Sequence, residues 1–386
     1  MAHEKMNLFR FPTGAGSNPV KLGHEEAIAE QVERGHSVRA PLPRLLMVFS
    51  FLSHTSGSHS VAEDLSNKLR DQTGGIIQVS PYRSGLLRSL HMVATTLWRR
   101  RAYDLAIVGL YSGRAFLWGE AVASLLKLLG RPFVISMHGG SLPEFAAQNP
   151  ERVKNTLRRA SAVTAPSHYL LEQMRPYCDD ILLLPNPIEI ERYEFRPRTN
   201  PQPRLIWLRA FHEIYNPEMA VQVANRLKME FPDLRLTMVG PDKNDGSWQR
   251  TAEAAQKSAV QDRLLMPGGV ANSEVPRWLH RGDIFLNTTN VDNAPVSVIE
   301  AMACGLCIVS TNVGGLPYLL EDGLDALLVP PNDPDAMAAA VRRLLTEPEL
   351  AERLSRNARR KAESFDWSAV LPQWKSLLRR LASSKP

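Results

Sequence analysis

Short apolar runs alternate with amphipathic stretches along most of the chain. A run that is apolar throughout is typical of a strand buried in a parallel sheet, and apolar residues spaced three and four apart are typical of a helix. The pattern predicts strands at residues 44–50, 104–110, 132–137, 181–184, 205–208, 234–239, 284–286, 307–309 and 326–329. It predicts helices at residues 61–70, 115–129, 275–280, 335–346, 348–365 and 367–381. Because strands and helices alternate in each half, we expect an α/β protein with two doubly wound domains.

Prolines and charged residues mark the boundary between the two halves. Residues 191–203 are charged and contain Pro197, Pro201 and Pro203, a composition typical of a linker. Residues 1–43 are polar with little periodicity, which predicts a flexible or loosely docked extension. The expected division is therefore an extension at 1–43, a first domain at 44–195, a second domain at 196–365 and a C-terminal helix at 366–386.

One strand–loop–helix–strand unit, at residues 284–309, carries the clearest pattern in the chain. Asn293 has a side chain preferred at a helix N-cap, Pro295 suits the first turn, and Gly305 suits the residue that ends a helix. A helix N-terminus offers unpaired N–H groups and the positive end of a dipole, which favour a diphosphate. The pattern therefore predicts a phosphate-binding helix start near residue 295.

Two acidic residues flank this helix start. Glu300, deeper in the helix, cannot bind phosphate because like charges repel, but its carboxylate can accept hydrogen bonds from a vicinal diol such as a ribose. Asp292, in the preceding loop, can do the same for the hydroxyls of a sugar. From the spacing alone, a solvated loop acid and an ordinary helix acid remain the alternative.

The same stretch resembles the donor-site motif of the family 4 retaining glycosyltransferases, in which an acid, seven residues and a glutamate precede an Ala-Met-Ala-x-Gly run. Here residues 292–300 precede Ala-Met-Ala-Cys-Gly at 301–305, and the similarity continues through 311–317 and 321–323. Asp292 is a shortened version of the usual glutamate. The resemblance extends over about residues 44–380 and implies the GT-B fold, with two Rossmann-like domains facing a cleft and a terminal helix that crosses back to the first domain.

The resemblance implies that the nucleotide-sugar donor binds in the second domain. Arg209 and the N–H groups of the helix start would hold the diphosphate, Glu300 would bind the ribose, and Asp292 with Asn293 would bind the sugar hydroxyls. The bend that ends at Val270 would frame the base. The full expected donor-binding set is Gly57, Arg209, Val270, Asp292, Asn293, Ala294, Pro295, Val296, Ser297 and Glu300.

The chain departs from the family pattern at the second diphosphate-binding cation. The family has a glycine before the arginine and a lysine a few residues later, whereas this chain has Leu208 before Arg209 and no lysine in residues 210–217. His212 or Asn216 could partly compensate, but neither has a fixed positive charge. This departure puts the affinity for the donor in doubt without removing the site, because one arginine can bind phosphate through two nitrogens.

His138 is the candidate reactive residue of the first domain. It follows the strand at 132–137 and precedes Gly139 and Gly140, so it is placed to face the crevice at the carboxyl ends of the strands. A lone histidine is more often structural, but the resemblance implies that His138 contacts the transferred sugar, so we assign catalytic roles to His138 and Arg209. Gly139 and Glu144 would help His138 to hold the acceptor.

The resemblance implies a retaining, metal-independent hexosyltransferase. The donor substrate would be a UDP- or GDP-linked sugar, with no separate cofactor and no metal. The acceptor would be a hydroxyl of a glycan, a lipid or a small molecule, and the product would belong to cell-surface polysaccharide or glycolipid synthesis. Two other classes stay open, namely an epimerase or phosphorylase of the same architecture and a non-catalytic homologue that binds a nucleotide sugar.

The formal net charge of +6 adds a second question, the nature of any anionic partner. Residues 83–101 combine leucines with four arginines after residue 87, which suits a helix lying on an anionic membrane surface. An ordinary amphipathic helix with a solvated basic end is the alternative. No nucleic-acid-binding module accompanies the basic residues, so we expect no nucleic acid partner.

Cysteine content and hydropathy indicate the cellular compartment. The three cysteines provide no disulfide framework, and the Cys304–Cys307 pair has the spacing of a redox motif but falls at an expected helix end, where packing is the better interpretation. No apolar run reaches the ~18 residues of a membrane span, and residues 1–43 lack the apolar core of a signal peptide. The expectation is a cytoplasmic protein, peripheral on the inner face of the membrane if residues 83–101 bind lipid.

Overall fold

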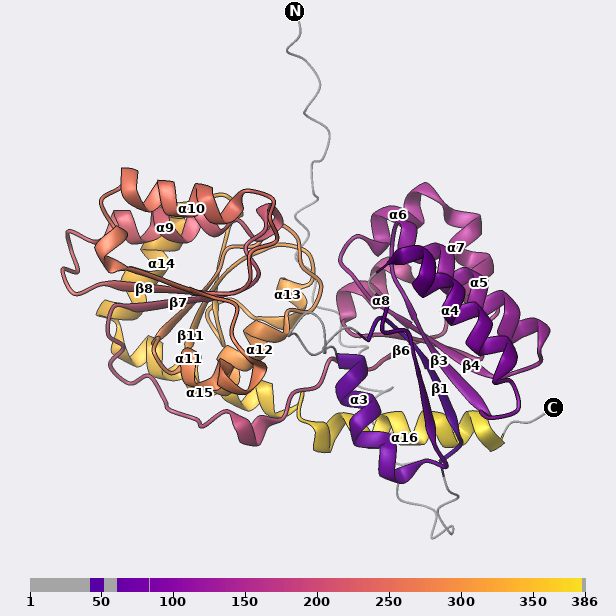
Figure 1. Ribbon diagram of the computed structural model, residues 1–386. Coiled ribbons are helices and arrows are strands. Elements are labelled where there is room, and N and C mark those ends of the chain that lie inside the picture. The colour runs from indigo at the N-terminus through magenta and orange to yellow at the C-terminus, as the bar shows by residue number, and fades with distance from the viewer. Residues whose placement is uncertain (1–41, 52–60, 83, 384–386) are drawn as a thin grey trace, which may run out of the picture. The chain divides into compact units, whose positions relative to one another are not determined.

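The computed structural model describes residues 42–51, 61–82 and 84–383. Nearly all of the expected extension at 1–43 lies outside these ranges. The described residues form two six-stranded, wholly parallel sheets, in the orders β2-β1-β3-β4-β5-β6 and β12-β11-β10-β7-β8-β9. Helices cover both faces of each sheet (Figure 1). This arrangement confirms the predicted α/β class with two doubly wound sheets.

The first sheet and its helices are formed by residues 45–174 with one further strand. The strands are β1 Leu45–Val48, β2 Ile76–Val79, β3 Leu105–Leu110, β4 Phe133–Met137, β5 Ala162–Ala165 and β6 Ile181–Leu183. The helices are α3 Val61–Leu69, α4 Gly85–Trp98, α5 Arg114–Leu128, α6 Leu142–Gln148, α7 Pro150–Leu157 and α8 His168–Met174. The apolar pattern did not predict β2, an edge strand that is only partly buried.

The second sheet is formed by residues 204–329, and further helices follow it. The strands are β7 Arg204–Leu208, β8 Arg235–Val239, β9 Leu264–Gly268, β10 Ile284–Asn287, β11 Cys307–Thr311 and β12 Leu327–Val329. The helices are α9 Pro217–Leu227, α10 Ser247–Lys257, α11 Val275–Leu279, α12 Val296–Ala303, α13 Leu316–Leu319, α14 Pro334–Thr346, α15 Pro348–Glu363 and α16 Trp367–Ser383.

Each sheet is buried on both faces, as the unbroken apolar runs predict. In β1 the side chains alternate between two hydrophobic clusters, Leu46 and Val48 in one and Leu45 and Met47 in the other. The alternation follows from the two-residue period of a strand. The cluster around Leu45 also contains Trp367 and other residues of α16, so the C-terminal helix packs against the first sheet. The chain therefore returns to its first half after completing the second sheet.

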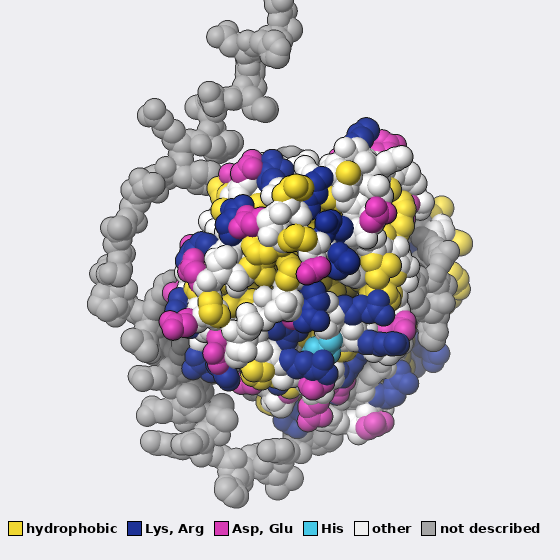
Figure 2. All heavy atoms as spheres, turned by 90° about the vertical axis from the view of Figure 1, so that its left-hand side faces the viewer, with side chains coloured by type: hydrophobic (Ala, Val, Ile, Leu, Met, Phe, Trp, Pro, Cys, Tyr) yellow, Lys and Arg dark blue, Asp and Glu magenta, His cyan; other side chains and the backbone are white. Residues whose placement is uncertain are grey.

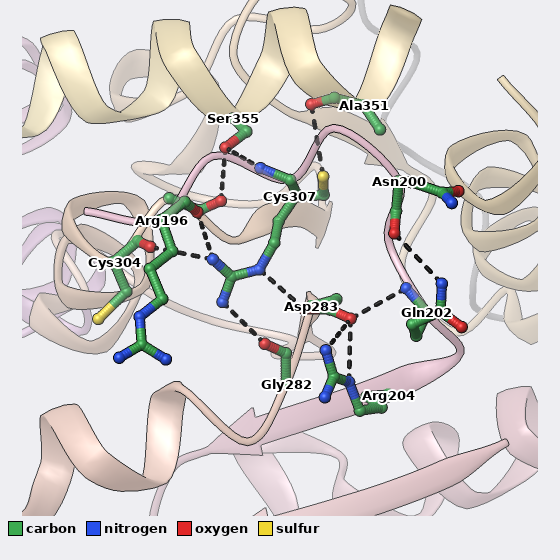
Figure 3. Close-up of polar contacts among 12 residues, drawn as sticks. Arg196, Asn200, Gln202, Arg204, Gly282, Asp283, Cys304, Cys307, Ala351 and Ser355 are labelled. Carbon is green, nitrogen blue, oxygen red and sulfur yellow. Dashed lines mark hydrogen bonds and ion pairs between the residues drawn. The ribbon is translucent and has the colours of Figure 1, made fainter. Parts of the chain in front are cut away.

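The segment that joins the two sheets is fixed to the second one by a buried ion pair (Figure 3). The Arg198 guanidinium contacts the Asp283 carboxylate at 2.9 Å, and both side chains are less than one-tenth exposed. Arg198 also donates to the carbonyl of Gly282 at 3.0 Å, and Arg204 pairs with the other Asp283 oxygen at 2.8 Å. Ser355 of α15 accepts from the Arg198 backbone N–H at 3.1 Å. These contacts hold the linker rigidly against the loop that leads into β10.

Charged side chains of both signs lie side by side on the face of the second sheet's helices that Figure 2 shows. Ion pairs between neighbouring helices account for part of this pattern, as in Arg250–Glu218 at 2.8 Å and Arg342–Glu230 at 2.7 Å. Such exposed pairs each stabilise a fold by only about 0–1 kcal/mol. In the described part of the chain, no helix combines the length and the apolar character needed to span a bilayer.

Candidate donor site at the carboxyl ends of the strands

The candidate site forms where the carboxyl ends of β7 and β10 meet. The two strands are neighbours in the second sheet, so Arg209, which follows β7, lies beside the loop that follows β10. That loop is polar yet buried, because Thr288 accepts from the Trp207 indole N–H at 2.9 Å and donates to the Tyr215 carbonyl at 2.8 Å. The polar residues at the start of this loop therefore hold it in place.

Arg209 and Asp292 form an ion pair within the site. The Arg209 guanidinium contacts an Asp292 carboxylate oxygen at 2.5 Å, and both side chains are largely buried. Arg209 also lies 4.0 Å from the centre of the Tyr215 ring and 3.5 Å from the Ser297 hydroxyl. Burial raises the pKa of Asp292, and the Arg209 charge acts in the opposite direction. The expected phosphate ligand and the expected sugar ligand thus neutralise each other here.

The predicted role of Asn293 as the cap of this helix is wrong. α12 begins at Val296, the cap position is Pro295, and no side chain caps the helix. The Asn293 side chain accepts a short hydrogen bond from the hydroxyl of Ser167, which itself caps α8 beside the first sheet. Proline has no N–H, so the first N–H groups of α12 belong to Val296 and Ser297. The helix start still presents donors, two residues later than the pattern predicts.

Two glycines after β11 shape the loop that carries Asp292. A Cβ atom on Gly314 would lie 2.1 Å from the Asp292 carbonyl oxygen, and one on Gly315 would lie 1.7 Å from that of Asn293. The Gly315 N–H donates to the Asp292 carbonyl at 3.0 Å. Gly314 also has a φ of 53°, which disfavours other residues. The two glycines are therefore part of the site, although no donor contact was predicted for them.

Glu300 is buried and hydrogen-bonded to a residue that no motif singles out. The hydroxyl of Tyr193, from the end of the first half, donates to a Glu300 carboxylate oxygen at 2.6 Å. Burial raises the pKa of Glu300 to about 7, opposed by the hydrogen bond from Tyr193 and the charges of Arg192 and Arg209. Near neutral pH this carboxyl group therefore exchanges between its charged and uncharged forms. The sequence gives no signal for Tyr193, because its contact joins residues 107 apart.

A cavity of about 540 Å³ connects these residues and has walls from both halves of the chain. Its second-sheet wall includes Glu300, Arg209, Val296 and Val270 among the expected donor ligands, and also Leu208. Its other wall comes from α3 and from residues near the linker. The additional polar lining residues are Asp64, Asn67, Lys68, Glu189, Arg192, Tyr193 and Asn272. The volume is in the range of small-molecule sites.

The two residues expected to compensate for the missing lysine are used elsewhere. The His212 ring accepts from the Ile214 N–H at 3.2 Å, and the Asn216 amide donates to Asn332 at 2.9 Å. The other cations of the cavity wall are Lys68, which pairs with Glu189 at 2.7 Å, and Arg192. The positive charge opposite Arg209 is therefore supplied by residues outside the loop that follows β7.

His138 lies beside the large cavity, in a small cavity of about 20 Å³ whose lining shares Val61, Pro187 and Trp367 with it. Its ring stacks on Tyr111 at 5.2 Å, and its Nε2 atom is 3.0 Å from the Ser136 hydroxyl. Burial lowers the pKa of His138 to about 4, so the ring is neutral at pH 7. A neutral ring can exchange hydrogen bonds with a sugar but carries no charge to stabilise a leaving group.

The glycines after His138 approach the donor loop. A Cβ atom built on Gly140 would lie 3.4 Å from Val291 and 3.9 Å from the Asn293 nitrogen, and Gly139 has a φ of 91°. Glu144 is exposed on the first turn of α6, where it adds to the burial that raises the pKa of Tyr169. The structure therefore brings the His138 loop to Asp292 and leaves Glu144 on the surface. Gly57 lies outside the described residues.

The Cys304–Cys307 pair agrees with the packing interpretation. Both thiols are free and buried, and burial raises the pKa of each to about 12. The Cys307 thiol donates to the Ala351 carbonyl of α15 at 3.5 Å (Figure 3). Gly305, between them, ends α12 with a φ of 76°, as predicted.

Two parallel doubly wound sheets, with the candidate site at the carboxyl ends of the second, define a GT-B glycosyltransferase. The model "Glycosyl transferases group 1" matches residues 190–361, and the model "Glycosyltransferase Family 4" matches residues 29–192. The chain belongs to this family of glycosyltransferases. The boundary between the two matches falls in the segment that joins the two sheets.

Named relatives match mainly parts of the chain. Over 205 residues the chain is 29% identical to glycogen synthase of Mycobacterium tuberculosis, which is 52% of this chain and 49% of that protein. Over 170 residues it is 30% identical to a phosphatidylinositol N-acetylglucosaminyltransferase component of Arabidopsis thaliana, which is 43% of this chain and 36% of that protein. The chain thus spans about half the length, or less, of these relatives.

Solved structures share the fold over nearly the whole chain. Sucrose-phosphate synthase from Thermosynechococcus elongatus superposes with a TM-score of 0.74 at 18% identity, covering 88% of this chain and 99% of that one. HepE of Anabaena, in complex with UDP and glucose, superposes with a TM-score of 0.72 at 18% identity, covering 88% and 100%. At this level of identity the similarity establishes the architecture.

Proposed function

We propose that the protein is a retaining glycosyltransferase that moves a hexose from a nucleoside-diphosphate sugar to an acceptor hydroxyl. The observation that carries this proposal is the cavity that joins Glu300, Arg209 and the start of α12. Such a cavity offers a carboxylate for a ribose diol, a guanidinium for a diphosphate and helix N–H groups for its oxygens. Apolar lining from Leu208, Val239 and Val270 suits the face of a base.

A UDP-linked hexose is the donor to test first, with GDP as the alternative. HepE, which has the same fold, is described in complexes with UDP, with UDP and glucose, and with UDP-glucose. Relatives named for glycogen, colanic acid and glycolipid synthesis support an acceptor that is a growing glycan or a lipid-linked sugar. We place the product in cell-surface polysaccharide or glycolipid synthesis on this basis.

In the proposed reaction the acceptor oxygen bonds to the anomeric carbon on the face from which the diphosphate leaves. The bond from that carbon to the diphosphate oxygen breaks, and the acceptor proton passes to the leaving phosphate, so the configuration is retained. Arg209 and the N–H groups of Val296 and Ser297 stabilise the charge that develops on the diphosphate. Because these groups supply the positive potential, we expect transfer to continue after treatment with EDTA.

His138, Gly139 and Glu144 serve the acceptor and the transferred sugar in this proposal. The Gly140 backbone lies against the loop of Asp292, so a hexose bound by Asp292 would lie close to the His138 loop. The neutral His138 ring would donate to or accept from a sugar hydroxyl. Glu144, on the first turn of α6, would contact only an acceptor that reaches the surface.

Donor binding requires the Arg209–Asp292 pair to rearrange. The diphosphate must replace the Asp292 carboxylate as the partner of Arg209, and the sugar hydroxyls then become partners of the freed carboxylate. This competition, with the absence of a lysine in residues 210–217, supports a second candidate, a homologue that binds nucleotide sugars without transferring them. The two candidates differ in turnover and agree in binding.

A thermal-shift panel of UDP, GDP and ADP with their common hexose forms tests the proposed function. A ligand that binds only the folded state at a hundredfold excess over its dissociation constant stabilises it by about 2.7 kcal/mol. We expect a selective shift with one nucleoside diphosphate and its hexose form, followed by transfer to a glycan or lipid acceptor. A shift without turnover would support the non-catalytic candidate, and a flat panel would contradict both.

The variant Asp292→Asn separates binding of the diphosphate from use of the sugar. Because the amide leaves Arg209 without its anionic partner, we expect tighter binding of the free nucleoside diphosphate. We also expect at least tenfold slower transfer, since hydrogen bonds to a charged group are worth about 1.5–3 kcal/mol. Calorimetry and turnover assays on Asp335→Asn, which breaks an exposed ion pair with Arg226, provide the control. Unchanged binding and turnover in Asp292→Asn would refute the assigned roles.

A further inference from the structure

The outward face of α4 is apolar, the reverse of what a helix on a protein surface normally shows. Leu86 is 72% exposed, Leu90 is 59% exposed and Trp98 is 78% exposed, whereas Met92 and Thr96 are buried. A helix at the surface of a globular domain turns its apolar stripe to the core and its polar residues to water. Here a polar threonine lies inside and leucines lie outside.

The exposed residues of α4 form one continuous stripe. With 3.6 residues per turn, positions 86, 90, 94 and 97 fall along one side, and positions 87 and 98 fall beside them. Ala94 completes the stripe without a polar group. The exposed leucines are therefore gathered on one face, where isolated surface leucines would need no explanation.

The neighbouring helix α5 extends this apolar area. α5 packs against α4 and lies next to it in Figure 1. Leu117 and Leu128 of α5 are 54% and 84% exposed, and Ala121 and Ser124 lie between them at helical spacing. Seven of the fourteen large exposed hydrophobic residues in the described part of the chain lie on these two helices. We call the area formed by Leu86, Leu87, Leu90, Leu97, Trp98, Leu117 and Leu128 the α4–α5 face.

Positive charge borders the α4–α5 face. Arg99, Arg100 and Arg101 follow α4 directly and are exposed, and Arg114, also exposed, begins α5. Residues 85–101 contain no aspartate or glutamate. Leucines and a tryptophan in the centre with arginines at one end are the composition of a helix that lies in the plane of a membrane interface.

We propose that the α4–α5 face docks the protein on an anionic lipid bilayer. The leucines and Trp98 would enter the boundary between headgroups and acyl chains, and the three arginines would contact anionic headgroups through their long side chains. A second copy of the chain fits less well, because two such faces in contact would bring arginines against arginines. The proposal concerns a surface separate from the donor cavity, and it stands whether or not the protein transfers a sugar.

Co-sedimentation of the full chain with lipid vesicles tests this proposal. We expect binding to vesicles of phosphatidylcholine mixed with phosphatidylglycerol, little binding to phosphatidylcholine alone, and weaker binding as the salt concentration rises. The double variant Leu90→Gln, Trp98→Gln should lower the partition coefficient at least tenfold. Met229→Gln, at a residue 83% exposed beside the second sheet, is the matched apolar control and should bind as the natural chain does.

The arginines are tested by replacing Arg99, Arg100 and Arg101 together with glutamine. Each basic residue near an anionic surface contributes about fivefold to partitioning, so the triple variant should bind roughly a hundredfold more weakly. Replacing the exposed Arg158, Arg175 and Arg277 removes the same charge elsewhere and should have a much smaller effect.

Three results would overturn the proposal. The natural chain could remain in the supernatant with anionic vesicles, or the Leu90/Trp98 variant could sediment as the natural chain does. Sedimentation velocity could instead reveal a dimer that this variant abolishes, which would assign the face to a second copy. Circular dichroism of each variant verifies that a loss of binding is not a loss of fold.

Discussion

Glu300 shows how burial alters the chemistry of a single residue. Its position eight residues after Asp292 is visible in the sequence, but its pKa near 7 results from burial under Val296 and the cavity lining. A folded-state pKa above the ordinary 4.5 means that the folded protein binds the proton more tightly than the unfolded chain. The stability of the fold should therefore decrease as the pH rises from about 4.5 to about 7.

The variant Glu300→Gln should remove this pH dependence. The uncharged amide still accepts from Tyr193, so the free energy of unfolding should increase by up to about 3 kcal/mol at pH 8 and change little at pH 4.5. The same variant should bind a nucleoside diphosphate about 1.5–3 kcal/mol more weakly, because it loses a charged acceptor for the ribose. Urea unfolding at both pH values and calorimetry measure the two effects.

A matched substitution of an exposed acid, Glu253→Gln on α10, should leave stability and affinity unchanged. If Glu300→Gln and Glu253→Gln behaved alike at pH 8, burial of a charged Glu300 would not be a cost to the fold. If only affinity were unchanged, the ribose role would be wrong.

At the scale of elements, the site depends on how closely the loops after β10 and β11 approach each other. β10 and β11 are adjacent parallel strands, so their carboxyl ends bring residues 288–295 and 312–315 together. Gly314 and Gly315 allow the backbones to touch, and the Gly315 N–H holds the Asp292 carbonyl at 3.0 Å. The position of Asp292 is therefore decided by a neighbouring loop.

A pair of glycine substitutions separates backbone strain from this contact. Gly314 and Gly130 have similar φ angles of 53° and 61°, but a Cβ atom meets the Asp292 carbonyl at 2.1 Å in the first and nothing within 4 Å in the second. Gly130→Ala should cost about 1 kcal/mol of stability and leave nucleotide binding intact. Gly314→Ala should cost more and weaken binding at least tenfold. Urea unfolding and calorimetry measure both; equal losses of affinity would contradict the contact's role.

At the scale of the whole molecule, the linker and the cavity depend on contacts between distant parts of the chain. The cavity wall includes Lys68 of α3 as well as Glu300 of α12, and Tyr193 reaches Glu300 from the end of the first half. The segment that follows Tyr193 is fixed by Arg198 and Asp283, both buried. We infer that this ion pair fixes the course of the linker and so supports the position of Tyr193.

The variant Asp283→Asn tests how much the buried network contributes. It leaves Arg198 without an anionic partner in a buried position, which typically costs about 3–5 kcal/mol. The control Glu218→Gln breaks an exposed pair with Arg250 and should cost at most about 1 kcal/mol. Denaturant unfolding of both variants measures the difference, and similar small losses would show that the linker is held by other contacts.

The sequence alone determined the fold class and most of the donor-side residues. Parallel strands buried on both faces require unbroken apolar runs, and the motif at 292–305 carries its pattern within a few residues, so both can be recognised locally. The Gly305 helix end was predicted for the same reason. Local patterns also indicated the leucines and arginines of residues 83–101, but not which side of α4 faces the core.

Tertiary structure decided the features that depend on residues far apart in the chain. Asn293 fits the local rule for a helix cap, yet its side chain bonds to Ser167, 126 residues away, and the helix begins at Val296. The partners of Arg209 and Glu300, the raised pKa of Glu300 and the outward apolar face of α4 likewise follow from packing. Burial and pairing arise only when the chain has folded, so no local pattern can encode them.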